Sequence, residues 1–272
     1  MRTLVIGGSG FLGSALTQEL SCLGTHYRNE QPYAPIEFDF WKDDPASLID
    51  RYQPAVVVCA AAVEYYDHDI PRESFTAAAE RLVTACRDRR FIYVSSDAVF
   101  DGTMGQYPET ARPTPVSEYG HRLAVFEKLV RSNCEEYCIV RPSYLYGFAR
   151  GELDHRLART RDKVQAGETV EYFTDMFKSP IVVTEAAAAI SALIEESVTG
   201  IVHCGGPRTS VYEFHCEALA GLGFSTDTIV PTRIPDGMDV PRDSSLKTTR
   251  LLQTTGIRPT TVREALKQNL SE

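Results

Sequence analysis

A glycine-rich turn near the beginning of the chain has the residue types and the spacing that bind phosphate groups. An apolar, strand-favouring run at residues 4–6 leads into the turn Gly7-Gly8-Ser9-Gly10-Phe11-Leu12-Gly13, and an amphipathic run follows at residues 14–20. Gly7 would allow the sharp turn, Gly10 would let the backbone approach a pyrophosphate, and Gly13 would let the helix pack closely on the strand. The helix N-terminus adds free N–H groups and a positive dipole end for the phosphates.

The order of these segments decides how the turn is interpreted. A glycine triplet by itself also marks ordinary turns, so its spacing alone is weak evidence. Here the triplet follows a strand and opens a helix, which favours dinucleotide binding. We therefore expect Ser9, Phe11 and Leu12 to contact the cofactor together with the glycines.

The end of the second predicted strand bears on the choice between NADP and NAD. That strand covers residues 25–27 and is followed by Arg28 and Glu30. An acid here binds the ribose 2′-hydroxyl of NAD, whereas an arginine accommodates the 2′-phosphate of NADP. Arg28 favours NADP, although it could equally be a solvated loop cation, and Glu30 keeps NAD open.

The overall composition is that of a globular protein without membrane segments. Of the 272 residues, 43% are hydrophobic, and no apolar run approaches the roughly 20 residues of a membrane-spanning helix. The chain passes directly from Met1 into the first predicted strand, so we expect no signal peptide and hence a cytoplasmic protein. The net charge of −9 argues against general nucleic-acid binding, but an anionic small ligand needs only local positive charge.

The cysteines form neither a metal-binding nor a disulfide pattern. There are seven, they are scattered, and several lie inside apolar runs. This arrangement is typical of reduced, buried thiols. Cys134 and Cys138 lack a matching pair of His or Cys ligands, so we expect no metal site.

Strands and helices alternate through the first half of the chain, which is the pattern of a doubly wound parallel sheet. The continuous apolar run at residues 55–62 is typical of a parallel strand buried on both faces. Beyond the opening strand and helix, we predict strands at residues 25–27, 36–40, 91–96 and 137–140 and helices at residues 45–52, 73–87 and 116–131.

The second half of the chain has a looser pattern. It contains predicted helices at residues 153–165, 184–197, 211–222 and 261–270 and predicted strands at residues 170–173 and 200–204. We therefore expect an α/β protein with a Rossmann-type dinucleotide-binding domain at residues 1–147. Residues 148–272 would form a smaller α/β substrate lobe packed on it as one compact unit.

Several short motifs along the whole chain match one family. Besides the glycine turn they are Cys59-Ala60-Ala61-Ala62, Ser95-Ser96-Asp97-Ala98-Val99-Phe100-Asp101-Gly102, Tyr107-Pro108-Glu109, Tyr119-Gly120, Arg141-Pro142-Ser143-Tyr144-Leu145-Tyr146-Gly147, Ser179-Pro180 and Gly200-Ile201-Val202-His203. With these motifs the chain resembles the extended short-chain dehydrogenase/reductase group, most closely the dTDP-4-dehydrorhamnose reductase family. The segment through Phe100-Asp101-Gly102 is quite specific to that family.

The resemblance also implies a mechanism. Such enzymes reduce a keto group of a sugar nucleotide with a nicotinamide hydride, and a tyrosine gives the proton to the carbonyl oxygen. By position, Tyr119 would be the proton donor and Ser96 its hydroxyl partner, while a lysine four residues after the tyrosine holds the nicotinamide ribose. A phenol has a pKa near ~10, so it becomes a useful acid–base group at pH 7 only beside a cation.

The chain departs from the family pattern at that lysine. Leu123 stands four residues after Tyr119, and none of the lysines follows a tyrosine at that spacing. Phe75 also stands where the family carries an asparagine. Arg122, on roughly the same helical face as Tyr119, could supply the cation, although its planar guanidinium differs from an ammonium. Alternatively, Tyr119 is retained for binding only, or a bound substrate supplies the missing group, and Leu123 then packs the helix on the sheet.

Further residues are assigned by their position and by the resemblance. Asp39 and Phe40 would bracket the adenine, and small residues after the buried strand would let a loop lie against the nucleotide. The additional cofactor contacts expected are Ala60, Ala61, Ala62, Pro142 and Tyr144. The substrate contacts expected are Ser96, Asp97, Tyr146, Arg156 and Lys178, although Arg156 could also belong to a solvated basic helix face.

These features fit best an NAD(P)H-dependent reductase that acts on a sugar nucleotide or a related small ketone, with NADP as the expected cofactor. The missing lysine favours an alternative, a catalytically silent NAD(P)-binding regulatory protein. An epimerase or dehydratase of the same superfamily is another alternative. We expect a small-molecule substrate, no nucleic-acid or membrane partner, and a monomer or homodimer.

Overall fold

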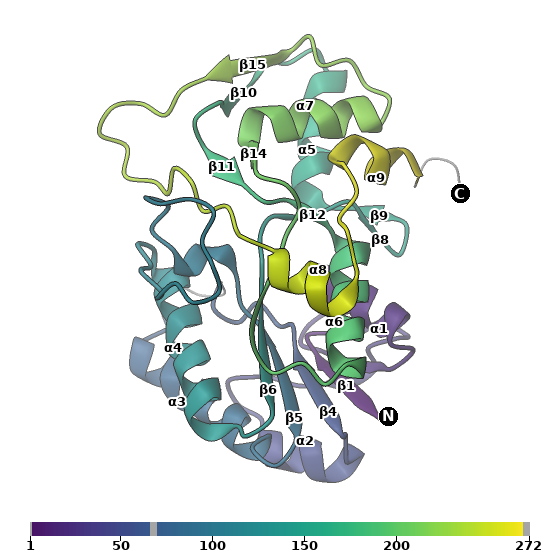
Figure 1. Ribbon diagram of the computed structural model, residues 1–272. Helices are drawn as coiled ribbons and strands as arrows, with labels where there is room; N and C mark the ends of the chain where they lie inside the picture. The colour runs from purple at the N-terminus through teal and green to yellow at the C-terminus, as the bar shows by residue number, and fades with distance from the viewer. Residues whose placement is uncertain (1, 66–69, 269–272) are drawn as a thin grey trace.

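A seven-stranded parallel sheet forms the centre of the structure (Figure 1). The structure is a computed structural model, and it describes residues 2–65 and 70–268. The sheet order is β13-β6-β5-β4-β1-β2-β3, with β1 (Thr3–Ile6), β2 (Leu23–His26), β3 (Ile36–Glu37), β4 (Val56–Cys59), β5 (Arg90–Val94), β6 (Tyr137–Pro142) and β13 (Gly200–Cys204). The order reverses between β1 and β4, and such folds bind their ligands beyond the carboxyl ends of the strands at that point. The predicted doubly wound α/β fold is confirmed.

Helices cover both faces of the sheet and bury alternate side chains of its strands. One face carries α2 (Pro45–Tyr52), α3 (Arg72–Ala85) and α4 (Glu118–Asn133), and the other carries α1 (Phe11–Glu19), α6 (Val183–Glu195) and α8 (Thr249–Thr255) (Figure 1). In β4, Val57 and Cys59 join the first core, whereas Val56 and Val58 join the second. All four are completely buried, which explains why this strand is a continuous apolar run.

A smaller lobe follows β6 and has a core of its own (Figure 1). Its helices are α5 (His155–Gln165), α7 (Val211–Gly221) and α9 (Val262–Gln268). Its strands are short and form four pairs: β7 (Leu145–Tyr146) with β12 (Ile181–Val182), β8 (Phe148–Ala149) with β9 (Glu152–Leu153), β10 (Val170–Phe173) with β15 (Ile229–Thr232), and β11 (Phe177–Lys178) with β14 (Thr209–Ser210). Leu157, Phe214 and Leu266 bring the three helices together in this core.

The domain boundary predicted between residues 147 and 148 does not separate the two lobes, because later segments of the chain return to the main sheet. The later elements α6, β13 and α8 belong to the main sheet and its covering layer. β13 pairs with β6 from Gly200 opposite Cys138 to Cys204 opposite Pro142. The edge of β6 would otherwise be left unpaired. The second half of the chain therefore builds both the smaller lobe and one edge of the Rossmann sheet.

Two predicted elements have different bounds for local reasons. The strand predicted at residues 36–40 covers only Ile36–Glu37, because the Asp39 carboxylate accepts a hydrogen bond from the Trp41 N–H at 2.9 Å and turns the chain. The helix predicted from residue 116 begins at Glu118. The Ser117 hydroxyl caps it by accepting a hydrogen bond from the Gly120 N–H at 3.0 Å.

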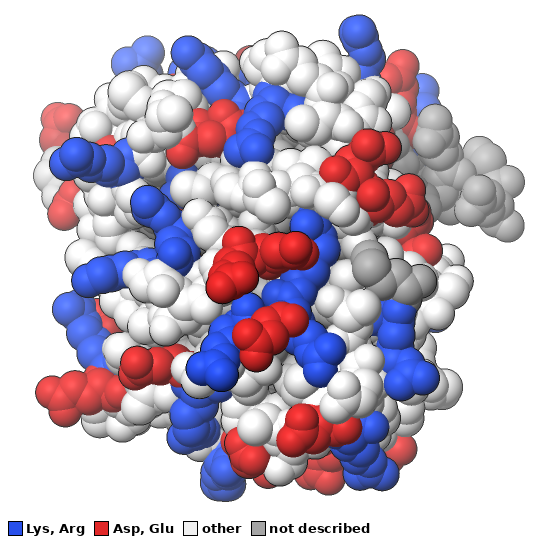
Figure 2. Space-filling view, turned by 60° about the horizontal axis from the view of Figure 1, so that its bottom comes forward, with Lys and Arg blue, Asp and Glu red and all other residues white. Residues whose placement is uncertain are grey.

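The surface and the cysteines complete the description of the fold. On the face turned forward in Figure 2, basic and acidic side chains are interspersed. No helix within residues 2–65 and 70–268 is both long and apolar enough to cross a membrane. Over the same ranges, no three His, Cys, Asp or Glu side chains gather as metal ligands. Five of the seven cysteines are buried and all are free thiols, as predicted.

Candidate active site

Backbone contacts that require glycine form the turn between β1 and α1. Gly7 has φ +82°, and its N–H donates to the Thr25 hydroxyl at 3.0 Å. A side chain at Gly7 would come within 2.5 Å of the Ala61 Cα, and one at Gly13 would come within 2.0 Å of the Gly7 carbonyl oxygen. The same close approach places the loop that contains Ala60, Ala61 and Ala62 against the turn.

Gly10 differs from those two glycines. A Cβ built there meets only the Gly7 carbonyl oxygen, at 3.3 Å, and Gly10 is exposed. Gly10 is also the N-cap of α1, where no side chain makes a capping hydrogen bond. The packing of the protein thus does not require glycine at this position, whereas a phosphate against the helix N-terminus would. The residues present at this turn fit a dinucleotide pyrophosphate.

The residues predicted to contact the adenosine lie beyond β2 and β3. Arg28 is exposed, and its guanidinium lies 4.9 Å from the centre of the Tyr27 ring. Asp39 turns the chain after β3, so contacts of Arg28 and Asp39 with a cofactor stay predictions. Phe40 is only 6% exposed, and its ring centre lies 6.3 Å from that of Phe126 in the core. The structure corrects the prediction for Phe40, because its ring packs in the core and does not lie open to an adenine.

Ser96 and Tyr119 meet beyond the carboxyl end of β5. Ser96 precedes the short 3₁₀ helix η1 (Asp97–Val99) and caps it, its hydroxyl accepting a hydrogen bond from the Ala98 N–H at 3.2 Å. Tyr119 lies in the first turn of α4, and its phenol is hydrogen-bonded to the Ser96 side chain. The next residue, Gly120, lets α4 approach, because a Cβ there would come within 2.2 Å of the Ala98 carbonyl oxygen. The structure thus brings the two predicted catalytic residues together.

Asp97 connects this pair to the smaller lobe. Its carboxylate accepts hydrogen bonds from the Ser96 hydroxyl at 3.1 Å and from the Lys178 ammonium at 2.9 Å. The hydroxyls of Ser143 and Ser244 donate to it at 3.0 Å each. Asp97 is 5% exposed, and these four donors from the protein itself occupy the acceptor positions of its carboxylate. The structure therefore corrects the predicted substrate contact of Asp97, whereas Lys178 stays partly exposed.

The surroundings of the Tyr119 phenol favour its protonated form. Burial raises the pKa of Tyr119 well above its usual value, and the charge of Glu64 raises it further. Three smaller influences follow in order of size. The hydrogen bond with Ser96 lowers this pKa, the charge of Asp97 raises it, and the charge of Arg156 lowers it. Burial disfavours the phenolate most strongly, so Tyr119 stays protonated at neutral pH.

Leu123, which occupies the position of the family's lysine, belongs to the core. It is 1% exposed and packs in the same cluster as Phe126 and Val130 on the face of the sheet that α4 covers. The prediction that Leu123 packs the helix on the sheet is confirmed. This position therefore holds the fold together and presents no charge to the phenol.

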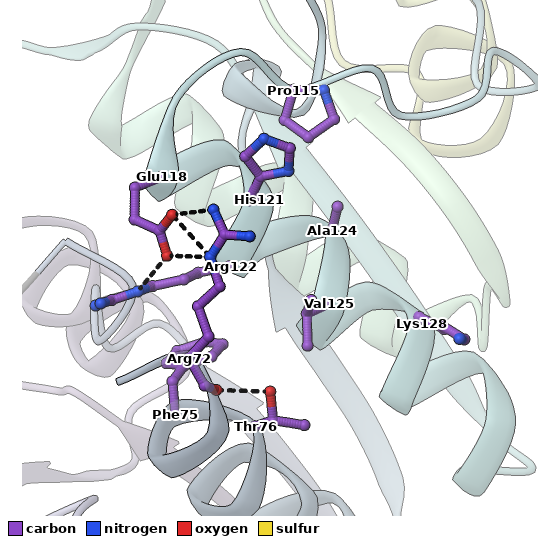
Figure 3. A pocket seen from close by; sticks show the side chains of 10 residues that line it. All are labelled: Arg72, Phe75, Thr76, Pro115, Glu118, His121, Arg122, Ala124, Val125 and Lys128. Carbon is purple, nitrogen blue, oxygen red and sulfur yellow. Dashed lines mark hydrogen bonds and ion pairs between the residues drawn. The ribbon is translucent and has the colours of Figure 1, made fainter. Parts of the chain in front are cut away.

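Arg122 has partners just before α3, on α3 and at the start of α4. Its guanidinium donates to the Ile70 carbonyl oxygen at 2.8 Å, lies 3.4 Å from the Glu118 carboxylate, and lies 5.6 Å from the centre of the Phe75 ring. Phe75, Glu118 and Arg122 line a hollow of about 280 Å³ between α3 and α4 (Figure 3). These contacts commit the guanidinium to the α3 side of the helix. They do not support the predicted replacement of the family's lysine by Arg122.

A buried carboxylate that was not singled out in the sequence lies near the phenol. Glu64, in the loop after β4, is 4% exposed and accepts a hydrogen bond from the Tyr93 hydroxyl at 2.5 Å. Burial raises the pKa of Glu64 to about 7, although the Tyr93 hydrogen bond and the charge of Arg122 lower it. The neighbouring Tyr65 ring packs edge-on against the Tyr119 ring, with 5.7 Å between centres. The sequence feature that could have indicated Glu64 is an acidic residue a few positions after a buried strand, at the end of the sheet where such folds bind ligands.

The tyrosines after β6 belong to the smaller lobe. The Arg156 guanidinium lies 3.8 Å from the centre of the half-buried Tyr144 ring. Tyr146 is 1% exposed, and its ring centre lies 5.2 Å from that of Phe214 in the core of the lobe. The structure corrects the predicted substrate contact of Tyr146, because its ring is enclosed. Pro142 ends β6 and is buried, and cofactor contacts of Pro142 and Tyr144 stay predictions.

Comparisons relate the chain to known proteins along its whole length. A family model described as the RmlD substrate binding domain matches residues 1–272. "Probable low-salt glycan biosynthesis reductase Agl14" of Haloferax volcanii is 30% identical over 244 residues, covering 81% of this chain and 81% of that protein. Methionine adenosyltransferase 2 subunit beta of Danio rerio is 25% identical over 295 residues, covering 99% of this chain and 90% of that protein. A crystal structure of a hypothetical dTDP-4-dehydrorhamnose reductase from Sulfolobus tokodaii has a TM-score of 0.82 at 26% identity, covering 96% of this chain and 98% of that one.

Proposed function

The chain belongs to the RmlD substrate binding domain family, and from this membership we propose that it is an NAD(P)H-dependent reductase of a keto group on a sugar nucleotide. The family expected from the sequence motifs is thereby confirmed. The similar proteins include a probable low-salt glycan biosynthesis reductase and a hypothetical dTDP-4-dehydrorhamnose reductase. Their names support a reductase over an epimerase or a dehydratase.

The proposed cofactor is NADP, with NAD as the alternative. The open approach at Gly10 and the uncapped start of α1 would hold the pyrophosphate. Arg28, exposed beyond β2, would face the 2′-phosphate. When bound, the nicotinamide supplies the hydride that forms the new C–H bond of the product.

The observation that carries the proposal is the hydrogen-bonded pair of Ser96 and Tyr119. Ketone reduction needs a proton donor at the carbonyl oxygen, and the protonated Tyr119 phenol is such a donor. Alcohol oxidation would instead need the phenolate, which burial and the charge of Glu64 disfavour. Ser96, fixed by Asp97 and by its capping contact, orients the phenol. The site is therefore suited to reduction more than to the reverse reaction.

Two cations of the smaller lobe act on this pair, but burial and the charge of Glu64 outweigh the effect of Arg156 on the pKa of the phenol. Arg156, on α5, lowers the pKa of Tyr119. Lys178, on β11, is bonded to Asp97 and through it to Ser96. Both side chains come from the lobe that would bind the substrate, and a diphosphate is a ligand that Arg and Lys recognise. We therefore infer an anionic sugar nucleotide as the substrate class.

Titration of the purified protein with NADPH and with NADH tests the proposal when it is followed by incubation with a dTDP-4-keto-6-deoxyhexose. We expect cofactor binding and a loss of NADPH absorbance that requires the keto sugar. Tight cofactor binding without oxidation by any keto sugar nucleotide would overturn the reductase proposal and favour a silent NAD(P)-binding regulatory protein.

Matched variants of α5 test the role of Arg156. Arg156→Ala should lower kcat roughly 10-fold, because it removes a cation that acts on the phenol. Arg161→Ala, on the same helix, removes an arginine that is paired with Asp162 at the surface and serves as the control. Equal rates in the two variants would show that Arg156 has no part in the proton transfer.

A further inference from the structure

The carboxylate of Asp97 joins the smaller lobe to the hydroxyl of Ser96. Lys178, on β11 of the smaller lobe, donates from its ammonium to Asp97 Oδ2 at 2.9 Å. The Ser96 hydroxyl donates to the other carboxylate oxygen, Oδ1, at 3.1 Å. Two direct hydrogen bonds therefore connect a cation of the smaller lobe to a hydroxyl of the proposed active site.

The remaining partners of Asp97 are uncharged and buried. The hydroxyls of Ser143 and Ser244 donate to Oδ2 at 3.0 Å each, and both serines are buried, as Asp97 itself is. A buried carboxylate needs a positive charge as well as hydrogen bonds. Among the side chains of residues 2–65 and 70–268 that donate hydrogen bonds to this carboxylate, Lys178 is the one that carries a charge.

The backbone around Lys178 is fixed by several hydrogen bonds. The N–H of Ser179 donates to the Ser143 hydroxyl at 3.0 Å, and the Ser179 hydroxyl accepts the Leu246 N–H at 3.1 Å. β11 also pairs with β14, which places Lys178 opposite Thr209. The ammonium is therefore held at Asp97 by an ordered segment, although 23% of the Lys178 side chain is exposed.

Asp97 determines which way the hydroxyl hydrogen of Ser96 points. A serine hydroxyl donates one hydrogen and accepts two, whereas an ionised carboxylate only accepts. The hydrogen of Ser96 goes to Asp97, and its oxygen accepts the Ala98 N–H at 3.2 Å. One lone pair remains for the O–H of Tyr119, with which Ser96 is hydrogen-bonded. The orientation of this hydroxyl thus fixes the side from which the phenol is held.

Backbone packing also makes the position of Ser96 important for Tyr119. Ser96 caps η1, and the start of α4 lies directly against this short helix. A Cβ at Gly120, the residue after Tyr119, would come within 2.2 Å of the Ala98 carbonyl oxygen in η1. A movement of Ser96 and η1 would therefore change the approach of the hydroxyl to the phenol.

We propose that Lys178 is a positioning residue of the site, because its ion pair with Asp97 orients the Ser96 hydroxyl and thereby the Tyr119 phenol for proton transfer to the substrate ketone. The proposal rests on the proposed reductase function. Lys178 acts here through Asp97 and Ser96, without contacting the reacting carbonyl group. The ion pair also makes the geometry of the proton donor depend on the smaller lobe, the lobe that would bind the substrate.

Steady-state kinetics with NADPH and a dTDP-4-keto-6-deoxyhexose distinguish a positioning residue from a substrate contact. Lys178→Met removes the charge and should lower kcat roughly 10-fold while KM changes less than about threefold. Lys178→Arg keeps a positive charge and should recover most of the lost kcat. Arg242→Met is the control, because Arg242 pairs with Asp175 at 3.2 Å and its carbonyl oxygen accepts the N–H of Phe177 on β11. A raised KM at an unchanged kcat in Lys178→Met would make Lys178 a substrate contact only and overturn the proposal.

A double-mutant cycle with Ser96→Ala tests whether Lys178 acts through the hydroxyl. Once the hydroxyl is absent, Lys178→Met should change kcat by less than about twofold, because the two substitutions then interrupt the same connection. A loss of roughly 10-fold in both backgrounds would show that Lys178 acts by another route.

Thermal unfolding tests the ion pair without requiring turnover. Lys178→Met leaves the buried Asp97 carboxylate without its cation, so the melting temperature should fall by about 3 °C or more. Arg242→Met should change it by less than about 1 °C, since the side chains of Arg242 and Asp175 are 51% and 30% exposed. If the wild type never oxidises NADPH, the reductase proposal fails, while the melting temperatures still decide whether Lys178 holds Asp97. Equal melting temperatures of Lys178→Met and the wild type would contradict the ion pair on which the proposal depends.

Discussion

The two ends of the proposed cofactor site are built in different ways. At the phosphate end, the shape comes from backbone atoms, with Gly7 against Ala61 and the uncapped start of α1 behind Gly10. At the other end, charges from both lobes, those of Glu64, Asp97 and Arg156, influence the pKa of the Tyr119 phenol, and Lys178 is bonded to Asp97. A backbone cradle depends on a few glycines, whereas a set of charges changes with each substitution. The family resemblance therefore predicts cofactor binding more securely than it predicts proton transfer.

Removing the phenol hydroxyl should have the largest effect, because it impairs proton transfer at one end of the site and leaves cofactor binding at the other end nearly unchanged. Tyr119→Phe should lower kcat about 10²–10⁴-fold, the range for loss of a general acid. The ring still packs against Tyr65, so the affinity for NADPH should change little. Steady-state rates and a fluorescence titration with NADPH check both statements. Unchanged turnover would place the proton donor elsewhere.

A methyl group added at the phosphate end should weaken cofactor binding, which the Tyr119 substitution leaves nearly unchanged. Gly10→Ala should weaken NADPH binding by roughly 10-fold or more, because the backbone can no longer approach the pyrophosphate. The melting temperature should stay close to that of the wild type, since the new Cβ meets only one atom, at 3.3 Å. Calorimetric titration and thermal unfolding measure the two quantities. A wild-type dissociation constant in this variant would contradict the assignment of the turn.

Leu123→Lys, which restores the lysine of the family pattern, should destabilise the folded protein. Leu123 is 1% exposed in the core, so Leu123→Lys should lower the free energy of unfolding by about 3 kcal/mol or more. Leu123→Met, which conserves volume, should lower it by less than about 1.5 kcal/mol. Denaturant unfolding of both variants gives the comparison. Equal stability of the two would show that position 123 opens toward the site and can hold a charge.

A smaller effect of pH on stability distinguishes Glu64 from a paired carboxylate. Burial raises the pKa of Glu64 from 4.5 to about 7, so between these values the folded protein binds more protons than the unfolded chain. This contribution to stability is fully present below pH 4.5 and is lost as the pH rises through 7. The melting temperature of the wild type should therefore fall relative to Glu64→Gln as the pH rises from about 5 to about 8. A constant difference between the two proteins would contradict the raised pKa.

Local sequence patterns predicted the parts of the molecule that depend on neighbouring residues. The glycine turn was recognised because strand, turn and helix follow one another directly. The strand at Val56–Cys59 was recognised because burial on both faces requires a continuous apolar run. The bounds of β3 were less predictable, since a single side-chain contact of Asp39 ends the strand.

Contacts between distant parts of the chain were not predictable in the same way. The return of β13 to the edge of β6 joins residues about sixty positions apart, and no local signal marks it. The bond between Asp97 and Lys178 spans 81 positions. Glu64 is an ordinary acid in the sequence, and only its burial against Tyr93 distinguishes it. Arg122 was placed correctly on its helix, but the position of α3 determines which partners it meets.

Transfer of deuterium from deuterated NADPH tests the central claim most directly. The protein is incubated with a dTDP-4-keto-6-deoxyhexose and with NADPH that carries deuterium at the transferred position. The molecular mass of the sugar nucleotide is then measured by mass spectrometry. A reductase that uses Tyr119 as its acid adds one deuteride and one proton, so the product should gain about 3 Da and the gain should disappear in Tyr119→Phe. A sugar nucleotide recovered without this gain, with the cofactor still reduced, would contradict the claim that this chain is a reductase.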